Sequence, residues 1–373
     1  MKKTSLPDIW QALAASPDSI WLYGTGDGAD KILNVMNERG LWPVGVFVSD
    51  DFYRGQMFHG FSVLPLSEIQ KIPQPFTLVI SFGSHLPVLI ERIKDLAARF
   101  PVVIPDVPVA GKELFDRTFF ETHARELNEA KDLLSDDSSR EVFDQVIDYK
   151  LTGDPVPLFS SVSPKEDVLR ELFSHHPDEI PSYIDCGAYR GDTIEEFFRY
   201  FPRTDYQITA LEPDPGSFKK LRAAFGADPK IHLIRAACGN GSEADEPDEI
   251  LMVNGRGRGT HVPALTEGVA EGSSPDRLYR NIRVPLVRLD DLDFPVPPTY
   301  LKMDIEGQEK EALLGASNLI RTYRPLLNIA CYHRSADLFV LPKLIHDLYP
   351  GYRICLRRHD CFPCWDLNLY CTI

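Results

Sequence analysis

The stretch Tyr-Ile-Asp-Cys-Gly-Ala-Tyr-Arg-Gly-Asp-Thr at residues 183–193 decides the fold of the C-terminal half of this chain. An apolar run ends at Asp185, glycines follow at Gly187 and Gly191, and an amphipathic run then begins. This order predicts a buried strand that turns sharply into a helix. Glycine is expected at such a turn where the backbone must approach a ligand closely.

A second acidic residue lies at the end of the next apolar run, where residues 208–211 lead into Glu212 and Pro213. An acid roughly 20 to 30 residues after the first glycine, at the end of the second strand, is placed to accept hydrogen bonds from a ribose. No phosphate-binding loop with its lysine accompanies the turn, which argues against a nucleoside triphosphate. The two features together indicate a nucleoside-cofactor site.

Composition excludes several classes of partner. The chain has 373 residues, enough for two domains, and a formal net charge of −15. Nucleic acids and anionic membrane surfaces both need a basic footprint, so neither is expected as a partner. There is no apolar run of about 18 residues, and Pro7 and Asp8 interrupt the basic start, which is therefore not expected to be an export signal.

The cysteines favour a cytoplasmic location. There are seven, an odd number, mostly in apolar contexts, which suits buried thiols in a reducing compartment. Cys361 and Cys364 form a C-x-x-C pair, but no second pair completes a four-ligand metal set. Free thiols in a loop and a strand are the expected state of these two residues.

The first 110 residues alternate apolar strands with helical patterns, which predicts a parallel sheet covered by helices. Gly24 and Gly26 begin a G-x-G-x-x-A fingerprint, and Asp50 lies about where a ribose-binding acid belongs. We expect strands near 20–23, 44–48, 76–81 and 101–105, with a hairpin-like insert at 56–64. Binding of a nucleotide or sugar nucleotide, a structural or dimerising role, and a nicotinamide-dependent dehydrogenase all remain open for this domain.

The boundaries follow from changes in pattern. We predict a Rossmann-like domain over residues 1–110, a helical linker over 111–160 and a second α/β domain over 161–373. The linker has apolar positions at three- and four-residue steps, which predicts two amphipathic helices. Because these helices are apolar enough for an interface, a homodimer stays open. The fold class is thus α/β, with two Rossmann-like three-layer domains.

The second domain is expected to end in an antiparallel hairpin, because residues 357–366 are too few for a crossover helix. A parallel sheet with such an end is the arrangement of class I methyltransferases. Five motifs in order resemble the FkbM family of S-adenosylmethionine-dependent methyltransferases. They are D-x-G-A-x-x-G-D-T at 185–193, L-E-P-D-P at 211–215, L-D-D-L at 289–292, L-K-M-D-I-E-G at 301–307, and Tyr332-His333.

The resemblance implies methyl transfer from S-adenosylmethionine, usually to a hydroxyl group of a sugar, a glycan or a natural-product scaffold. It covers roughly residues 140–373, and the N-terminal part resembles the Rossmann-like domains at the front of sugar-modifying enzymes. The residues expected at the cofactor are Asp185, Gly187, Ala188, Gly191, Asp192, Thr193, Glu212, Pro213 and Cys238.

A second group of residues is expected at the acceptor. Lys302, Asp304 and Glu306 alternate along one predicted strand, so their side chains should share a face at its carboxyl end. Asp304, with Glu306, is expected to orient the acceptor hydroxyl, and Lys302 to bind the acceptor. A divalent cation stays an alternative, but the Asp–Glu pair lacks a clear third ligand, so no metal ligand is predicted.

His333 follows the next strand and should border the same crevice, either as the base that takes the hydroxyl proton or as a hydrogen-bonded structural histidine.

The glycine-rich loop at 254–275 carries Arg256 and Arg258. We expect these arginines to contact a phosphate or carboxylate of the acceptor, unless the loop is only a solvated surface loop. A non-catalytic scaffold that kept the fold is the alternative from another class.

Overall fold

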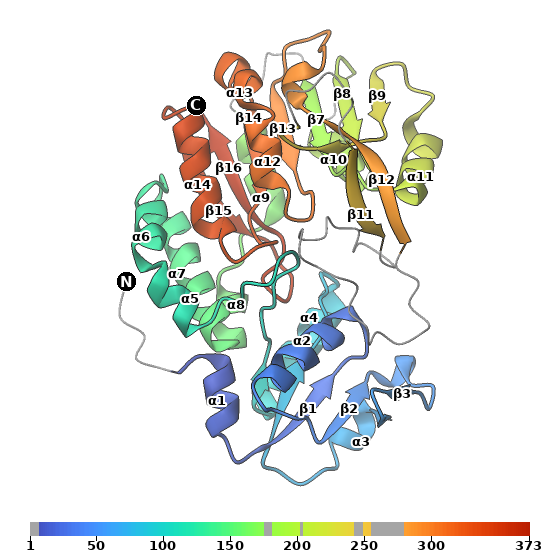
Figure 1. Cartoon of the computed structure of the whole chain (residues 1–373), viewed down its shortest axis with the longest axis vertical. Coiled ribbons are helices and arrows are strands. Elements are labelled where there is room, and N and C mark those ends of the chain that lie inside the picture. Colours follow the sequence, from blue (N-terminus) through green and yellow to red (C-terminus); the bar gives the residue numbers. More distant parts are fainter. Residues whose placement is uncertain (1–6, 175–180, 202–203, 242–248, 255–279) are drawn as a thin grey trace.

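The computed structural model describes residues 7–174, 181–201, 204–241, 249–254 and 280–373. Figure 1 shows an N-terminal α/β domain, a C-terminal α/β domain and a helical bridge that lies beside both. None of the described helices has both the length and the apolar character needed to cross a bilayer.

The N-terminal domain is built on a six-stranded sheet in the order β3-β4-β2-β1-β5-β6. Every neighbouring pair is parallel except β3 and β4, which form the predicted hairpin. Its strands are β1 (Ser19–Tyr23), β2 (Gly45–Val48), β3 (Met57–Phe58), β4 (Phe61–Pro65), β5 (Phe76–Ile80) and β6 (Val102–Val103). Its helices are α1 (Ile9–Ala15), α2 (Asp27–Glu38), η1 (Asp50–Phe52), α3 (Leu66–Ile69) and α4 (Pro87–Arg99).

Burial explains why these segments are strands. All residues of β2 and β5 are buried, as expected for central parallel strands covered on both faces. The predicted strand at 101–105 shrinks to two residues, because Pro101 and Pro105 have no amide hydrogen to donate to the ladder. The predicted parallel α/β architecture is confirmed.

The C-terminal domain has a seven-stranded sheet in the order β15-β16-β14-β13-β7-β8-β9. The strands are β7 (Ser182–Cys186), β8 (Gln207–Leu211), β9 (Ile231–Ile234), β13 (Tyr300–Met303), β14 (Leu326–Ala330), β15 (Arg353–Arg358) and β16 (Leu367–Thr372). The helices are α9 (Lys165–Phe173), α10 (Asp192–Tyr200), α11 (Pro215–Phe225), η2 (Leu289–Asp291), α12 (Glu309–Leu314), α13 (Ser317–Tyr323) and α14 (Asp337–Leu348). β16 is antiparallel to both β14 and β15 and lies between them, so the predicted hairpin is confirmed.

Two predicted elements of this domain are divided in the structure. The strand expected at 231–237 ends early, and β10 (Ala237–Cys238) joins a small separate sheet with β12 (Arg280–Val287) and β11 (Glu249–Asn254). The helix expected at 307–320 breaks at Gly315, where a Cβ atom would overlap the carbonyl oxygen of Gly239. This close approach stops α12, and α13 continues after it.

The bridge contains more helices than the two predicted. They are α5 (Arg117–Thr122), α6 (Ala124–Asp132), α7 (Asp137–Thr152) and α8 (Pro155–Ser160). The break between α5 and α6 is at His123, whose ψ of 17° is outside the helical range.

Apolar residues of the bridge, including Leu127 and Phe143, are buried in a core shared with both domains. The apolar face that suggested a homodimer therefore lies inside the chain, and the oligomeric state stays a prediction.

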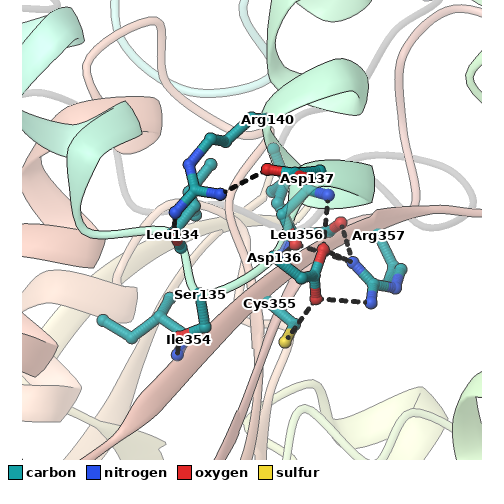
Figure 2. A network of polar contacts seen from close by, with 10 residues as sticks. Leu134, Ser135, Asp136, Asp137, Arg140, Ile354, Cys355, Leu356 and Arg357 are labelled. Carbon is teal, nitrogen blue, oxygen red and sulfur yellow. Dashed lines mark hydrogen bonds and ion pairs between the residues drawn. The ribbon is translucent and has the colours of Figure 1, made fainter.

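A polar network fastens the bridge to strand β15 (Figure 2). Asp136, the N-cap of α7, accepts a hydrogen bond of 2.9 Å from Arg357 Nη2 and one of 3.0 Å from Cys355 Sγ. Burial opposes ionisation of this carboxyl, but these hydrogen bonds lower the pKa of Asp136 well below its usual value. Because Ser139 Oγ also accepts the amide of Leu356 at 2.9 Å, the helix is held in register with the strand.

A buried ion pair connects the bridge to the N-terminal domain. Lys150 of α7 is 3% exposed and donates to Asp106, which is 9% exposed and follows β6. Beside this pair, the amide of Ile104 donates to the carbonyl of Gly153 at 2.8 Å. Removal of one member of a buried pair is costly because it leaves an uncompensated charge in a low-dielectric interior.

We expect Lys150→Met to lower the free energy of unfolding by about 3–5 kcal/mol, since Asp106 would remain buried without its partner. Lys131→Met is the matched control, because Lys131 pairs with Asp144 at 2.6 Å near the surface and should cost less than about 1 kcal/mol. Urea unfolding followed by circular dichroism measures both. Equal destabilisation by the two variants would contradict the role assigned to the Lys150–Asp106 pair.

Candidate functional site

The turn after β7 is closed by the end of the neighbouring strand. The amides of Gly187 and Ala188 both donate to the carbonyl of Leu211 at 3.0 Å, and Gly191, with a φ of 99°, is the N-cap of α10. Asp192 is the first residue of this helix and is exposed. The predicted strand–turn–helix is confirmed, and it lies at the carboxyl edge of the sheet, where ligands of open α/β sheets bind.

Asp185 lies at the buried base of this turn. Its side chain is fully buried, accepts a hydrogen bond from the hydroxyl of Thr193, and lies 3.7 Å from Nζ of Lys302. Burial raises the pKa of Asp185, while the lysine opposes that rise. Lys302, 8% exposed, is held inside the sheet by Asp185, and the carboxylates of Asp185 and Asp304 keep its pKa above the ordinary value in spite of burial.

Glu212 follows β8 and faces the same turn. Its Oε2 accepts the amide of Tyr189 at 2.9 Å, and its Oε1 accepts the amide of Asp214 at 2.8 Å. Burial raises the pKa of this carboxyl to about 7. A carboxylate has about four acceptor positions, so this side chain can accept further hydrogen bonds from a bound molecule. Pro213, which follows it, is half-buried.

The two glycines of the turn are required by the protein itself. A Cβ atom on Gly187, at a φ of 86°, would overlap the carbonyl oxygen of Asp304, and one on Gly191 would overlap the ring of Phe225. The sequence suggested that glycine was needed for a close ligand. The structure shows that the turn first packs against the loop after β13 and against helix α11.

The acidic residues Asp304 and Glu306 lie in a loop, which corrects the prediction that they continue a strand with Lys302. β13 ends at Met303. Glu306 and Gly307 then take positive φ values of 56° and 93°, which turn the chain away from the sheet. The Asp304 side chain is 40% exposed and that of Glu306 is 27% exposed. Burial raises the pKa of Glu306 to about 7.

His333 lies behind this loop and is completely buried. Its Nε2 is 3.3 Å from Asp304 Oδ1 and 3.8 Å from Glu306 Oε2. Burial alone would lower the pKa of His333, but Glu309 and the other two carboxylates raise it to about 10. The partly exposed carboxylates of Asp304 and Glu306 lie between the imidazole and the surface, and both interpretations of His333 stay predictions.

Glu309 belongs to this group, and sequence reasoning missed it. It is fully buried, and its Oε1 lies 3.0 Å from Nδ1 of His333. The same oxygen accepts the amide of Ile305 at 2.8 Å and so holds the loop. One feature of the sequence could have identified Glu309: it is an acid at the first position of a predicted helix, directly after the motif that ends at Gly307.

The remaining predicted residues are Cys238, Ala188, Arg256 and Arg258. Cys238 ends β10, where its thiol packs in the core next to that of Cys186. Ala188 is buried within the turn. Arg256 and Arg258 fall outside the described residues. The structure thus brings the turn at residues 187–191 to the same edge of the sheet as Glu212, Asp304, Glu306 and His333.

This geometry can be compared with known proteins. Residues 185–348 match the family model of the methyltransferase FkbM domain. The crystal structure of methyltransferase FkbM from Methylobacillus flagellatus KT is similar over 98% of this chain and 93% of that chain, with a TM-score of 0.66 and 20% identity. At that identity the likeness shows the fold, and it includes both domains.

Two further solved structures resemble a smaller part of this chain. One is the structure of a protein from Clostridium thermocellum that is described as an rRNA methylase. Its TM-score is 0.32, with 8% identity and coverage of 56% of this chain and 95% of that chain. Another is Aeropyrum pernix fibrillarin with bound S-adenosyl-L-methionine, with a TM-score of 0.31, 14% identity and coverage of 52% and 67%. No curated protein matches the chain.

The candidate nucleotide site of the N-terminal domain lies near the C-terminal domain, since Phe82, which packs by Gly24, contacts the ring of Phe362. Gly24 packs against Ser81, and Gly26 is the N-cap of α2. Asp50 Oδ1 accepts hydrogen bonds from the amide and the hydroxyl of Ser67, at 3.2 and 2.8 Å. The first turn of α2 carries two acids, Asp27 and Asp30, which is unfavourable for a phosphate. Binding of a nucleotide here stays a prediction.

Gly187→Ala should destabilise the C-terminal domain by about 3 kcal/mol, because alanine would combine a positive φ with overlap against the Asp304 carbonyl. Thermal unfolding followed by circular dichroism measures this effect. Gly216→Ala in α11 is the control: its φ is not positive and its new Cβ atom would lie 3.2 Å from Asp214 Oδ1. A Gly187→Ala protein as stable as this control would rule out the close approach.

Proposed function

We propose that this chain is an S-adenosylmethionine-dependent methyltransferase that methylates a hydroxyl group of a sugar-containing or polyhydroxylated acceptor. The single observation that carries the proposal is the placement of Glu212 beside the Gly187 turn at one sheet edge, with Asp304 packed against the same turn. The match of residues 185–348 to the FkbM domain supports the methyltransferase class. The choice of acceptor follows from the family resemblance.

The residues present fit the proposed cofactor. Glu212 would accept hydrogen bonds from the ribose hydroxyls with the acceptor positions that Tyr189 and Asp214 leave. The turn at 187–191 would lie beneath the methionine portion, held in place by Asp185 through Thr193. S-adenosylmethionine would supply an activated methyl group on its sulfonium sulfur.

Asp304 is the residue that we assign to the acceptor. Of the four side chains Asp304, Glu306, Glu309 and His333, that of Asp304 is the most exposed, at 40%. The hydroxyl of Tyr332 donates to its Oδ1 at 3.1 Å, which fixes the orientation of the carboxylate. Methyl transfer is an in-line displacement, so alignment of the acceptor oxygen with the methyl group supplies much of the rate. Lys302 is buried 3.7 Å from Asp185 and would hold that carboxylate in place beneath the turn.

We expect the purified chain to bind S-adenosylmethionine saturably in a calorimeter, and Glu212→Gln to weaken binding by about 10- to 100-fold, because hydrogen bonds to a charged acceptor are lost. Glu195→Gln, an exposed change on α10, is the matched control and should bind like the parent chain. Failure of the folded parent chain to bind would overturn the proposal and favour a non-catalytic scaffold.

The affinity for S-adenosylmethionine should depend on pH through Glu212. The free chain holds this carboxyl at a pKa of about 7, and the ribose hydroxyls need the ionised form as acceptor. Binding below pH 7 must therefore release a proton, and we expect about tenfold weaker affinity at pH 6 than at pH 8. Calorimetry at both pH values measures this difference. The same difference in Glu212→Gln would assign it to another group.

The acceptor class can be tested by transfer of a labelled methyl group from S-adenosylmethionine to a panel of free sugars, nucleotide sugars and polyhydroxylated compounds. We expect label in a hydroxyl of at least one sugar-containing member, and at least a 100-fold loss of rate in Asp304→Asn with cofactor affinity kept. Label found only in amine-containing compounds would contradict the assignment to a hydroxyl.

A further inference from the structure

The group around His333 carries more negative charge than the reaction proposed above uses. Three carboxylates, from Asp304, Glu306 and Glu309, lie within 3.8 Å of the two ring nitrogens. A protonated imidazole would balance only one of them. Among the described residues, no lysine or arginine forms an ion pair with these carboxylates: Lys31 donates to the carbonyl of Val109 at 2.9 Å, Arg334 donates to that of Gly307 at 2.8 Å, and Lys302 lies 3.7 Å from Asp185.

Buried polar atoms in this group also lack satisfactory hydrogen bonds. Neither ring nitrogen of His333 has a hydrogen bond of acceptable geometry among the described residues, and Glu309 Oε2 has no hydrogen-bond partner there. Both residues are 0% exposed. An ionisable group buried in this way is costly unless it is paired or binds a metal ion.

The spacing of the donor atoms suits a shared cation. One ligand atom each from Asp304, Glu309 and His333 lies within 4.8 Å of the others. The separation of 3.3 Å between His333 Nε2 and Asp304 Oδ1 is loose for a charged hydrogen bond. Two atoms that each bind one ion at about 2.1 Å are separated by about 3.0–3.4 Å.

We propose that this chain binds one divalent cation of the first transition row between Nε2 of His333 and the carboxylates of Asp304 and Glu306, which both lie on that side of the imidazole ring. A mixed set of imidazole and carboxylate donors favours such ions over calcium, which takes oxygen ligands alone. Asp304 and Glu306, whose side chains are partly exposed, would supply the oxygen ligands on the surface side, and the buried Nε2 of His333 the nitrogen ligand. Glu309 lies on the other side of the ring, where a carboxylate orients a metal-binding histidine.

The surroundings hold these donors in place. Glu309 Oε1 fixes the loop through the amide of Ile305, and the carbonyl of His333 accepts the amide of Ala110 at 2.9 Å. Since Gly187 packs on the Asp304 carbonyl, the ion would lie next to the proposed cofactor turn. There it would polarise an acceptor oxygen as a Lewis acid. This consequence rests on the proposed function, whereas the binding of the cation does not.

The test is titration of the chelator-treated full-length chain with MnCl₂, in which the resonance of free Mn²⁺ is measured by electron paramagnetic resonance. We expect one saturable site per chain, and at least tenfold weaker binding in Asp304→Asn and His333→Gln. Glu311→Gln, on the same helix as Glu309, is the control and should bind Mn²⁺ like the parent chain. Asp304→Asn is partly exposed and isosteric, so it serves as the test should His333→Gln not fold.

Absence of saturable Mn²⁺ binding by the folded parent chain would overturn the inference, as would equal binding by the parent chain and folded Asp304→Asn. Titration of the same samples with S-adenosylmethionine separates the two proposals. Cofactor binding without Mn²⁺ binding would remove the cation site and leave the methyltransferase. Mn²⁺ binding without cofactor binding would leave the cation site and remove the methyltransferase.

Discussion

The contact between Gly187 and the carbonyl oxygen of Asp304 constrains the whole candidate site. The two residues follow adjacent parallel strands, β7 and β13, and the space between them does not admit a Cβ atom. This approach lets the turn after β7 and the acidic loop after β13 lie against each other at the sheet edge. Any molecule bound over the turn would therefore be within reach of Asp304, and this proximity is what a transfer between two bound substrates requires.

Sequence periodicity predicted the sheets well because their central strands are buried on both faces. Strands such as β5 and β14 are apolar except for one buried polar residue each, Thr77 and Asn328, and the short link at 357–366 required the antiparallel end. These features are local, so a single sequence contains them. The Gly187 turn and Glu212 were found for the same reason, since each follows an apolar run directly.

Features that depend on distant parts of the chain were missed. Asp304 and Glu306 fit an alternating strand pattern, but left-handed backbone at 306–307 overrides that pattern. Glu309 resembles an ordinary first-turn acid, and only the tertiary structure brings it within 3.0 Å of His333, which follows β14. The N-terminal domain likewise contacts the other half through Ser84 and Phe362, whose backbones exchange hydrogen bonds of 2.7 and 3.0 Å. No local motif encodes such a contact.

The position of β16 has a consequence for synthesis of the protein. β14 and β15 leave the ribosome before β16 does, yet in the finished sheet they are separated by it. Until residues 367–372 emerge, the edge of β14 has no neighbour on that side, and its buried apolar residues are open to wrong pairing. The backbone hydrogen bond from Cys331, two residues before His333, to the carbonyl of Leu367 can form only once β16 has taken its place between β14 and β15.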